Sequence, residues 1–193
     1  MSPRFSLLLI FVCGSPFPER LLASTSPDAP DPLVAYVTPS AVHLRLERYS
    51  GMWDAELRLF PGSGGPTQTF ALKAESGMIL DGRFLQTRLF GLMQGMLFEE
   101  LATLGFDNAS QRFTRNAIHT FGTGSLVTSG TWLEPDRVIE LHGESIHPST
   151  GATIRVRQRL TFESSDAIVF ETFEQLANSP ESKTLEHRLT RTP

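Results

Sequence analysis

The fold is decided by the stretch Arg48-Tyr49-Ser50-Gly51-Met52-Trp53-Asp54-Ala55-Glu56-Leu57. It lies where a short amphipathic segment gives way to a long series of alternating segments, which predicts the start of a closed β-structure. A glycine two residues before a tryptophan lets the backbone turn tightly and carry a large ring into the base of a barrel.

Downstream of Gly51, turn signals recur about every ten residues, and the segments between them alternate or are rich in β-branched and aromatic residues. The short connections favour antiparallel neighbours, and closing the two edge strands on each other removes exposed edges. The sequence therefore predicts an all-β fold, an antiparallel up-and-down barrel of about ten strands. The predicted strands are 52–60, 67–75, 78–90, 97–107, 111–119, 126–134, 137–146, 152–163, 167–176 and 183–191, with Ser76-Gly77 expected to end the second.

Upstream of the barrel, Ser40 is expected to cap a short helix that runs through Tyr49. Residues 24–39 contain four prolines among small and acidic residues, which predicts an extended linker without helix or sheet. The predicted organisation is a signal peptide over 1–23, a linker over 24–39 and a single barrel domain over 40–193.

The signal-peptide prediction depends on Arg4 and the short apolar run that follows it, which is too short to cross a membrane. A real signal places the protein in the periplasm or outside the cell, without stable membrane insertion after processing; otherwise it is cytoplasmic. Cys13 is the only cysteine, which excludes a disulfide scaffold. Lipid attachment at Cys13 is an alternative, although the bulky Val12 precedes it.

The composition limits the classes of partner. The 193 residues carry a formal net charge of −4, whereas a nucleic-acid-binding surface concentrates Lys and Arg. We therefore expect no nucleic-acid partner.

Strand alternation indicates which side chains face the interior. In the strand over 152–163, Gln158 shares a face with four apolar residues, so the three arginines at 155, 157 and 159 are expected to face water. In the last strand, His187 shares a face with Leu185 and Leu189 and is expected to lie in the lumen.

The chain resembles two known groups of proteins. Gly51-Met52-Trp53 and the late Arg191 resemble calycins, in which a basic residue of the closing strand covers a tryptophan of the first strand. A longer pattern is similar to the bacterial family called "domain of unknown function 1579"; its residues are Leu80-Asp81-Gly82-Arg83-Phe84-Leu85, Leu104-Gly105-Phe106-Asp107-Asn108, Thr120-Phe121-Gly122-Thr123-Gly124, Pro148-Ser149-Thr150-Gly151 and Leu189-Thr190-Arg191.

The family resemblance implies a lipocalin-like barrel that is often exported and has no established activity. The calycin resemblance implies that Trp53 lies under Arg191 and that Gly51, Trp53 and Arg191 close the barrel. The chain departs from the family in having Ala117-Ile118-His119 where Trp-Ile-Asp is usual, and Glu100 where glycine is common. If these positions line a pocket, that pocket differs from the family's.

Two places in the sequence carry side chains that could bind a metal ion or haem. Glu140, His142 and Glu144 alternate on one strand face and could share a zinc ion, but an exposed strand face explains them better. His187 in an apolar lumen could be an axial haem ligand, and the alternative is a buried histidine with a hydrogen-bond partner.

The run over 90–98 contains Met93 and Met96 together with Gly91 and Gly95. Methionine adapts to irregular apolar partners and glycine permits local movement, so this run is predicted to be a portal beside the cavity. The alternative is a bulged strand packed into the core.

The leading functional prediction is the binding of a small, largely apolar molecule in the lumen, with no catalytic residue and no cofactor. The predicted ligand-binding residues are His187, Gln158, Arg83, Met93, Met96 and His119. Three alternatives stay open: a haem-binding barrel, an enzyme that uses Glu100, Arg83 and His119 for acid–base chemistry, and a filled structural or interaction barrel.

Overall fold

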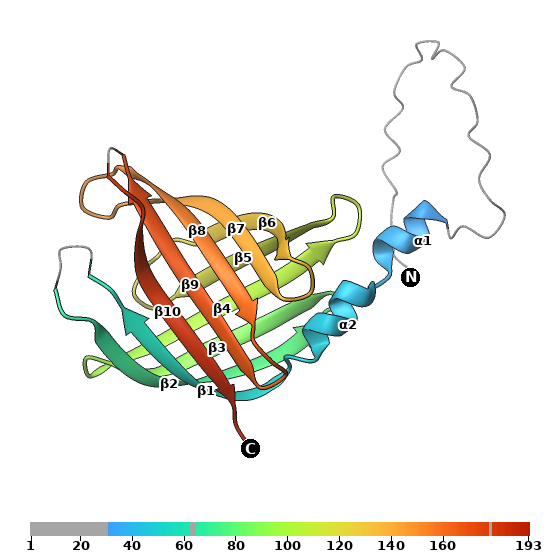
Figure 1. The fold of residues 1–193 in the computed structure, drawn as a ribbon, viewed down its shortest axis with the longest axis horizontal. Coiled ribbons are helices and arrows are strands. Elements are labelled where there is room, and N and C mark those ends of the chain that lie inside the picture. The colour runs from blue at the N-terminus through green and yellow to red at the C-terminus, as the bar shows by residue number, and fades with distance from the viewer. Residues whose placement is uncertain (1–30, 62–64, 178) are drawn as a thin grey trace, which may run out of the picture. The chain divides into compact units, whose positions relative to one another are not determined.

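The computed structural model describes residues 31–61, 65–177 and 179–193. The predicted signal peptide, Cys13 and the first residues of the predicted linker lie outside these ranges. The described chain forms a closed barrel preceded by two short helices, α1 (Pro32–Val37) and α2 (Ala41–Glu47) (Figure 1). In these ranges no helix is long and apolar enough to span a bilayer.

Ten strands in the described ranges follow one another around the barrel, each antiparallel to its neighbours, and the last pairs with the first. This confirms the predicted fold class. The strands are β1 (Gly51–Leu59), β2 (Gln68–Ile79), β3 (Phe84–Met93), β4 (Met96–Asp107), β5 (Arg112–His119), β6 (Leu126–Glu134), β7 (Val138–Ile146), β8 (Thr153–Phe162), β9 (Ala167–Leu176) and β10 (Ser182–Arg191).

One predicted turn was wrong. Ser76 and Gly77 lie inside β2, where Gly77 pairs with Gln86 of β3, and the strand continues to Ile79. The chain reverses instead at residues 80–82, whose φ angles are 51°, 53° and 78°. Successive positive φ angles break the strand, whereas a single glycine within a strand is tolerated.

The predicted extended linker is also corrected where it overlaps α1. Proline is compatible with the first turn of a helix, and Pro32 occupies that position. The carbonyl groups at the end of α1 are satisfied by the barrel, because Asn108 Nδ2 donates to Thr38 O at 2.8 Å and Arg83 NH2 donates to Val37 O at 2.8 Å. Residues 32–37 are thus helical and tied to the β-structure.

Helix α2 fills one end of the barrel, which we call the helical end. Leu46 and Tyr49 are buried and belong to the same core cluster as Trp53 and Phe162. The rings of Tyr49 and Phe162 stack with centroids 4.3 Å apart. Aromatic stacking and apolar burial therefore close this end, and any opening to the lumen lies at the opposite end, which we call the far end.

Arg191 covers Trp53 at the helical end. Its guanidinium carbon lies 4.3 Å from the centroid of the indole ring, so the contact implied by the calycin resemblance is present. The same guanidinium donates to Ser50 O at 2.9 Å and to Asp166 Oδ1 at 2.9 Å. Gly51 is required beneath it, because φ is 134° and a Cβ there would lie 2.7 Å from Arg191 NH1. That these residues close the barrel stays a prediction.

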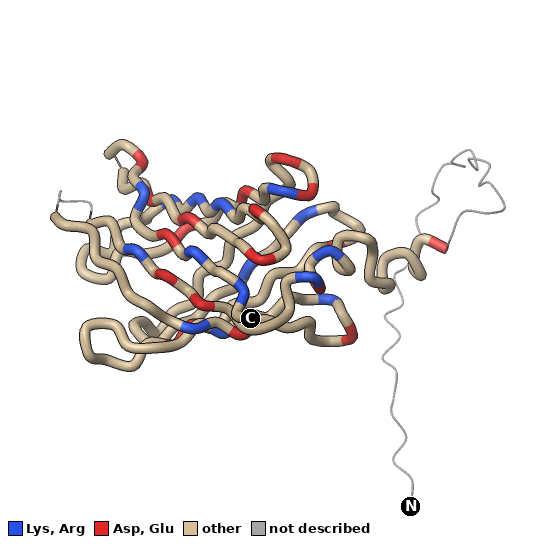
Figure 2. The backbone as a smooth tube through the Cα atoms, turned by 60° about the horizontal axis from the view of Figure 1, so that its bottom comes forward, with Lys and Arg blue, Asp and Glu red and all other residues tan. Residues whose placement is uncertain are grey.

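The outer wall carries interspersed charges of both signs (Figure 2). Arg157 and Arg159, predicted to face water, each bond to Glu140 Oε2 at 3.2 Å on the neighbouring strand. His142 Nε2 lies 3.3 Å from the other oxygen of Glu140. This carboxylate is therefore engaged by outward-facing cations, and the described residues include no group of three or more His, Cys, Asp or Glu side chains that could hold a metal ion.

Candidate functional site

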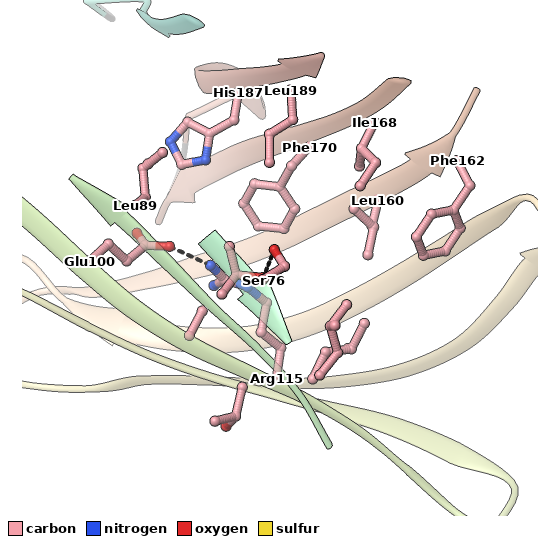
Figure 3. A pocket seen from close by; sticks show the side chains of 15 residues that line it. Ser76, Leu89, Glu100, Arg115, Leu160, Phe162, Ile168, Phe170, His187 and Leu189 are labelled. Atoms are coloured by element: carbon pink, nitrogen blue, oxygen red, sulfur yellow. Dashed lines mark hydrogen bonds and ion pairs between the residues drawn. The ribbon is translucent and has the colours of Figure 1, made fainter. Parts of the chain in front are cut away.

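The lumen contains a cluster of three polar side chains, of which Arg115 from β5 and His187 from β10 are buried and Glu100 from β4 is 15% exposed (Figure 3). We call these three residues the polar cluster. They line two cavities in the lumen. The polar cluster therefore lies where an inner cavity, toward the helical end, meets an outer cavity, toward the far end.

Within the polar cluster, Glu100 and Arg115 form a buried ion pair. Arg115 NH2 lies 2.6 Å from Glu100 Oε1, and the two side chains are only 10% and 15% exposed. The guanidinium carbon of Arg115 also lies 4.5 Å from the centroid of the Phe170 ring, which belongs to β9. The side chain of Arg115 therefore reaches from β5 across the lumen to β9.

His187 is buried against the same aromatic ring. Its imidazole stacks on Phe170 with centroids 5.7 Å apart and an interplanar angle of 29°. Its Nε2 atom is buried and has no hydrogen-bond partner among the described residues. Burial lowers the pKa of His187 to about 4; the charge of Glu100 opposes this shift and the charge of Arg115 adds to it. The imidazole is therefore neutral near pH 7.

The pKa of Glu100 lies below its usual range. Burial would raise this pKa, but the charge of Arg115 and the hydrogen bond that Arg115 donates outweigh burial. Glu100 is therefore ionised near pH 7 and balances the charge of Arg115. With His187 neutral, the polar cluster has no net charge.

The two cavities differ in size. The inner cavity has a volume of about 80 Å³ and the outer cavity about 260 Å³. An apolar cavity of about 150 Å³ holds benzene. The outer cavity thus has room for a molecule of one or two rings, whereas the inner cavity is too small for one ring.

The inner cavity is lined mainly by apolar side chains, whereas the outer cavity is lined by a mixture of apolar and polar side chains. Besides the polar cluster and Phe170, which line both, the inner cavity is lined by Ser76, Leu85, Thr87, Leu89, Ala102, Thr103, Leu104, Leu160, Phe162, Ile168 and Leu189. The outer cavity is lined by Leu59, Ala117, His119, Leu126, Gln158, Thr172, Glu174, Thr184 and Leu185.

Three of the predicted ligand-binding residues line the lumen together. Gln158 is buried and accepts a hydrogen bond from Thr128 Oγ1 at 2.9 Å, which occupies its amide oxygen. His119 lines the outer cavity near the far end, opposite Glu100 in the β4–β5 ladder. His187 lines both cavities. Among Gln158, His119 and His187, only His187 has a buried nitrogen without a partner in the described chain.

Arg83 lies elsewhere. Its guanidinium donates to Leu80 O at 3.1 Å and to Val37 O at 2.8 Å, and it lines neither lumen cavity. Arg83 follows the turn before β3, so its side chain turns toward α1 at the helical end. The expectation that it lies in the lumen was wrong.

Met93 and Met96 flank the two-residue turn Gln94-Gly95 of the β3–β4 hairpin at the far end. The φ angles of Gln94 and Gly95 are 52° and 81°, as a tight hairpin turn requires. Pairing is uninterrupted from Phe84 to Met93, so the bulged-strand alternative was wrong. Met93 is buried and Met96 is exposed, and neither lines a lumen cavity. The portal stays a prediction.

Sequence reasoning missed Arg115 and Glu174 as lumen residues. Arg115 alternates with Phe113 and Ala117 on the inner face of β5, a pattern that the sequence does contain. Glu174 lines the outer cavity, and burial raises its pKa although a hydrogen bond with Thr184 opposes the shift.

Comparisons with known proteins agree with this architecture. The model of the family described as "Protein of unknown function (DUF1579)" matches residues 38–191. No curated protein matches the sequence. Among solved structures, Rv2717c from M. tuberculosis is similar with a TM-score of 0.55 and 14% identity, covering 81% of this chain and 100% of that one. The S-type phycobiliprotein lyase CPES from Guillardia theta is similar with a TM-score of 0.53 and 10% identity, covering 83% of this chain and 97% of that one.

Proposed function

We propose that this chain, which belongs to the DUF1579 family of unknown function and folds as a lipocalin-like barrel, binds a small, largely apolar molecule in its lumen. The observation that carries the proposal is His187, which lines both cavities and whose buried Nε2 has no partner among the described residues. Buried polar atoms almost always have a partner, from the protein or from a bound molecule.

The apolar character of the ligand follows from the lining of the outer cavity. Leu59, Leu126, Leu185 and the ring of Phe170 contribute apolar surface to this space, so a molecule placed against them transfers apolar surface out of water. The gain is roughly 25 cal/mol for each Å² of apolar surface buried. The volume of the cavity limits the ligand to about two rings or a short acyl chain.

Binding can be tested with the protein as purified. Native mass spectrometry, followed by solvent extraction, should identify a molecule that co-purifies reproducibly. After its removal, equilibrium dialysis with naphthalene, a two-ring apolar probe, should show saturable binding at one molecule per chain.

The outer cavity can be tested as the binding site by filling it. Ala117 lines this cavity, and Ala117→Phe should abolish naphthalene binding because the new ring occupies the space. Asn116→Phe is the matched control, since Asn116 is the exposed neighbour on the same strand and should leave binding unchanged. A protein that carries no molecule and takes up no naphthalene would instead be a filled barrel.

A further inference from the structure

The charge balance of the polar cluster restricts the ligand. Glu100 and Arg115 already form a 2.6 Å ion pair, and the neighbouring imidazole of His187 is neutral. A ligand carboxylate would add an unbalanced negative charge beside Glu100, and a ligand ammonium would add an unbalanced positive charge beside Arg115. At the polar cluster each would have to lose its hydration beside charges that are already balanced, which is strongly unfavourable in a buried site. The other titratable side chains of the outer cavity are His119 of β5 and Glu174 of β9.

The free hydrogen-bonding capacity of the polar cluster restricts the ligand further. Nε2 of His187 has no partner in the described chain. A guanidinium has five N–H donors, and within the described residues Arg115 makes a single hydrogen bond, to Glu100. An oxygen atom of a bound molecule is the complement to these groups, because it can accept from Arg115 and, as a hydroxyl, can either accept from or donate to Nε2.

The placement of the polar cluster sets the orientation of the ligand. Its residues lie at the junction of the two cavities, and the space on the helical side is smaller than one ring occupies. The space on the far side is larger, and Leu59, Leu126 and Leu185 contribute apolar surface to it. A ligand that meets His187 with its polar atom therefore directs its apolar body toward the far end of the barrel.

We infer that the natural ligand is an uncharged molecule with an apolar body of one or two rings, or a short chain, and a single carbonyl or hydroxyl oxygen that binds His187 and Arg115. This inference rests on the proposed function and narrows it to neutral alcohols, phenols, ketones and aldehydes. Carboxylic acids and amines, which are charged near pH 7, are disfavoured as the group that meets the polar cluster.

A probe series with one constant body tests the inference. Equilibrium dialysis near pH 7 would compare naphthalene, 2-naphthol, 2-acetylnaphthalene and 2-naphthoate, of which only the last is charged. In wild-type protein we expect both neutral oxygen-bearing probes to bind more tightly than 2-naphthoate by at least about tenfold. Tighter binding of 2-naphthoate than of 2-naphthol would overturn the inference.

His187→Phe isolates the hydrogen bond to the imidazole. Phenylalanine keeps an aromatic ring against Phe170 and removes Nε2, so the fold should be retained. The preference for 2-naphthol over naphthalene should fall roughly three- to tenfold in this variant, the equivalent of one hydrogen bond. His142→Phe, the same change at an exposed histidine of the outer wall, should leave the preference unchanged. An unchanged preference in His187→Phe would contradict the role of His187.

Glu100→Gln tests the charge balance separately. It is isosteric and leaves Arg115 without its counter-ion, so binding of 2-naphthoate should tighten relative to 2-naphthol by about tenfold or more. If wild type and Glu100→Gln bind 2-naphthoate equally weakly relative to 2-naphthol, the charge of the polar cluster does not decide which ligand binds.

The naphthalene measurement separates the two proposals. If naphthalene fails to bind wild type, the proposed function itself is wrong. If naphthalene binds but the oxygen-bearing probes bind no more tightly, only this inference is refuted.

Discussion

Trp53 and Arg191 face each other across the β1–β10 ladder, with the guanidinium carbon 4.3 Å from the centroid of the indole ring. The indole is completely buried, and the guanidinium joins it to backbone carbonyls that lie outside the strand pair. One cation thus links the first strand, the last strand and the segment between α2 and β1. These contacts lie at the helical end, away from the outer cavity.

Trp53→Ala should therefore affect stability far more than ligand binding. Removal of a buried tryptophan side chain costs about 3–5 kcal/mol of unfolding free energy, from lost apolar burial and the cavity left behind. Urea denaturation should show this loss, while the affinity of the remaining folded protein for naphthalene should change less than about twofold. Met52→Ala is the control, because Met52 is exposed and its loss should cost under about 0.5 kcal/mol. A large loss of affinity in Trp53→Ala would place the ligand at the helical end instead.

Protonation of His187 should make the protein less stable in mild acid. Its pKa is 6.5 as a free side chain and about 4 when folded, so between these values the unfolded chain binds a proton that the folded chain does not. The contribution of the neutral His187 to the unfolding free energy is thus fully present above about pH 6.5. It decreases as the pH falls toward 4, by up to about 3 kcal/mol.

His187→Phe should remove this part of the pH dependence. The measurement is the unfolding free energy of both proteins by urea denaturation between about pH 7.5 and pH 4.5. The pKa of His43 is also lowered by burial, but His43 is present in both proteins and cancels in the difference. Parallel stability curves for the two proteins would show that His187 does not carry the effect.

The ion pair of the polar cluster should show strong coupling between its members. Glu100→Leu alone, or Arg115→Leu alone, leaves one buried charge without its partner and should cost about 3–5 kcal/mol. The double variant removes both charges and should lie within about 1 kcal/mol of wild type, because apolar side chains replace a buried pair at little net cost. A double variant whose loss equals the sum of the single losses would rule out the coupling.

Haemin should not bind through His187. The imidazole is buried and stacked on Phe170, and the outer cavity beside it holds about 260 Å³, which suits two rings rather than a porphyrin. A haemin titration of wild type and His187→Ala should therefore give the same absorbance spectra in the Soret region. A Soret shift that appears in wild type and disappears in the variant would make His187 a haem ligand after all.

The barrel was predictable because its signals are local. Alternation assigns Gln158 and His187 to the interior without any knowledge of which strands meet. The polar cluster was harder, because the ion pair of Glu100 and Arg115 joins residues that are not directly opposite in the ladder; Glu100 faces His119. A charged residue in an alternating strand is normally exposed, and only the partner across the ladder makes burial of Arg115 tolerable.

Other differences between prediction and structure have equally local causes. Glycine after serine commonly marks a turn, yet the pairing of Gly77 with Gln86 keeps Gly77 in β2. Arg83 is among the predicted ligand-binding residues, but it follows a turn, where strand alternation no longer fixes the direction of a side chain.

The pairing of β10 with β1 also has a consequence for the order of folding. Every other ladder joins strands that are neighbours in the sequence, so these hairpins can form early and locally, whereas the last ladder joins the two most distant strands. Contacts between distant segments form late, because the entropy of closing a long loop must be overcome first. Until then the edges of β1 and β10 are unpaired and open to association with other chains. The placement of Arg191 over Trp53 is thus expected to be the final step of folding and the one that ends the risk of aggregation.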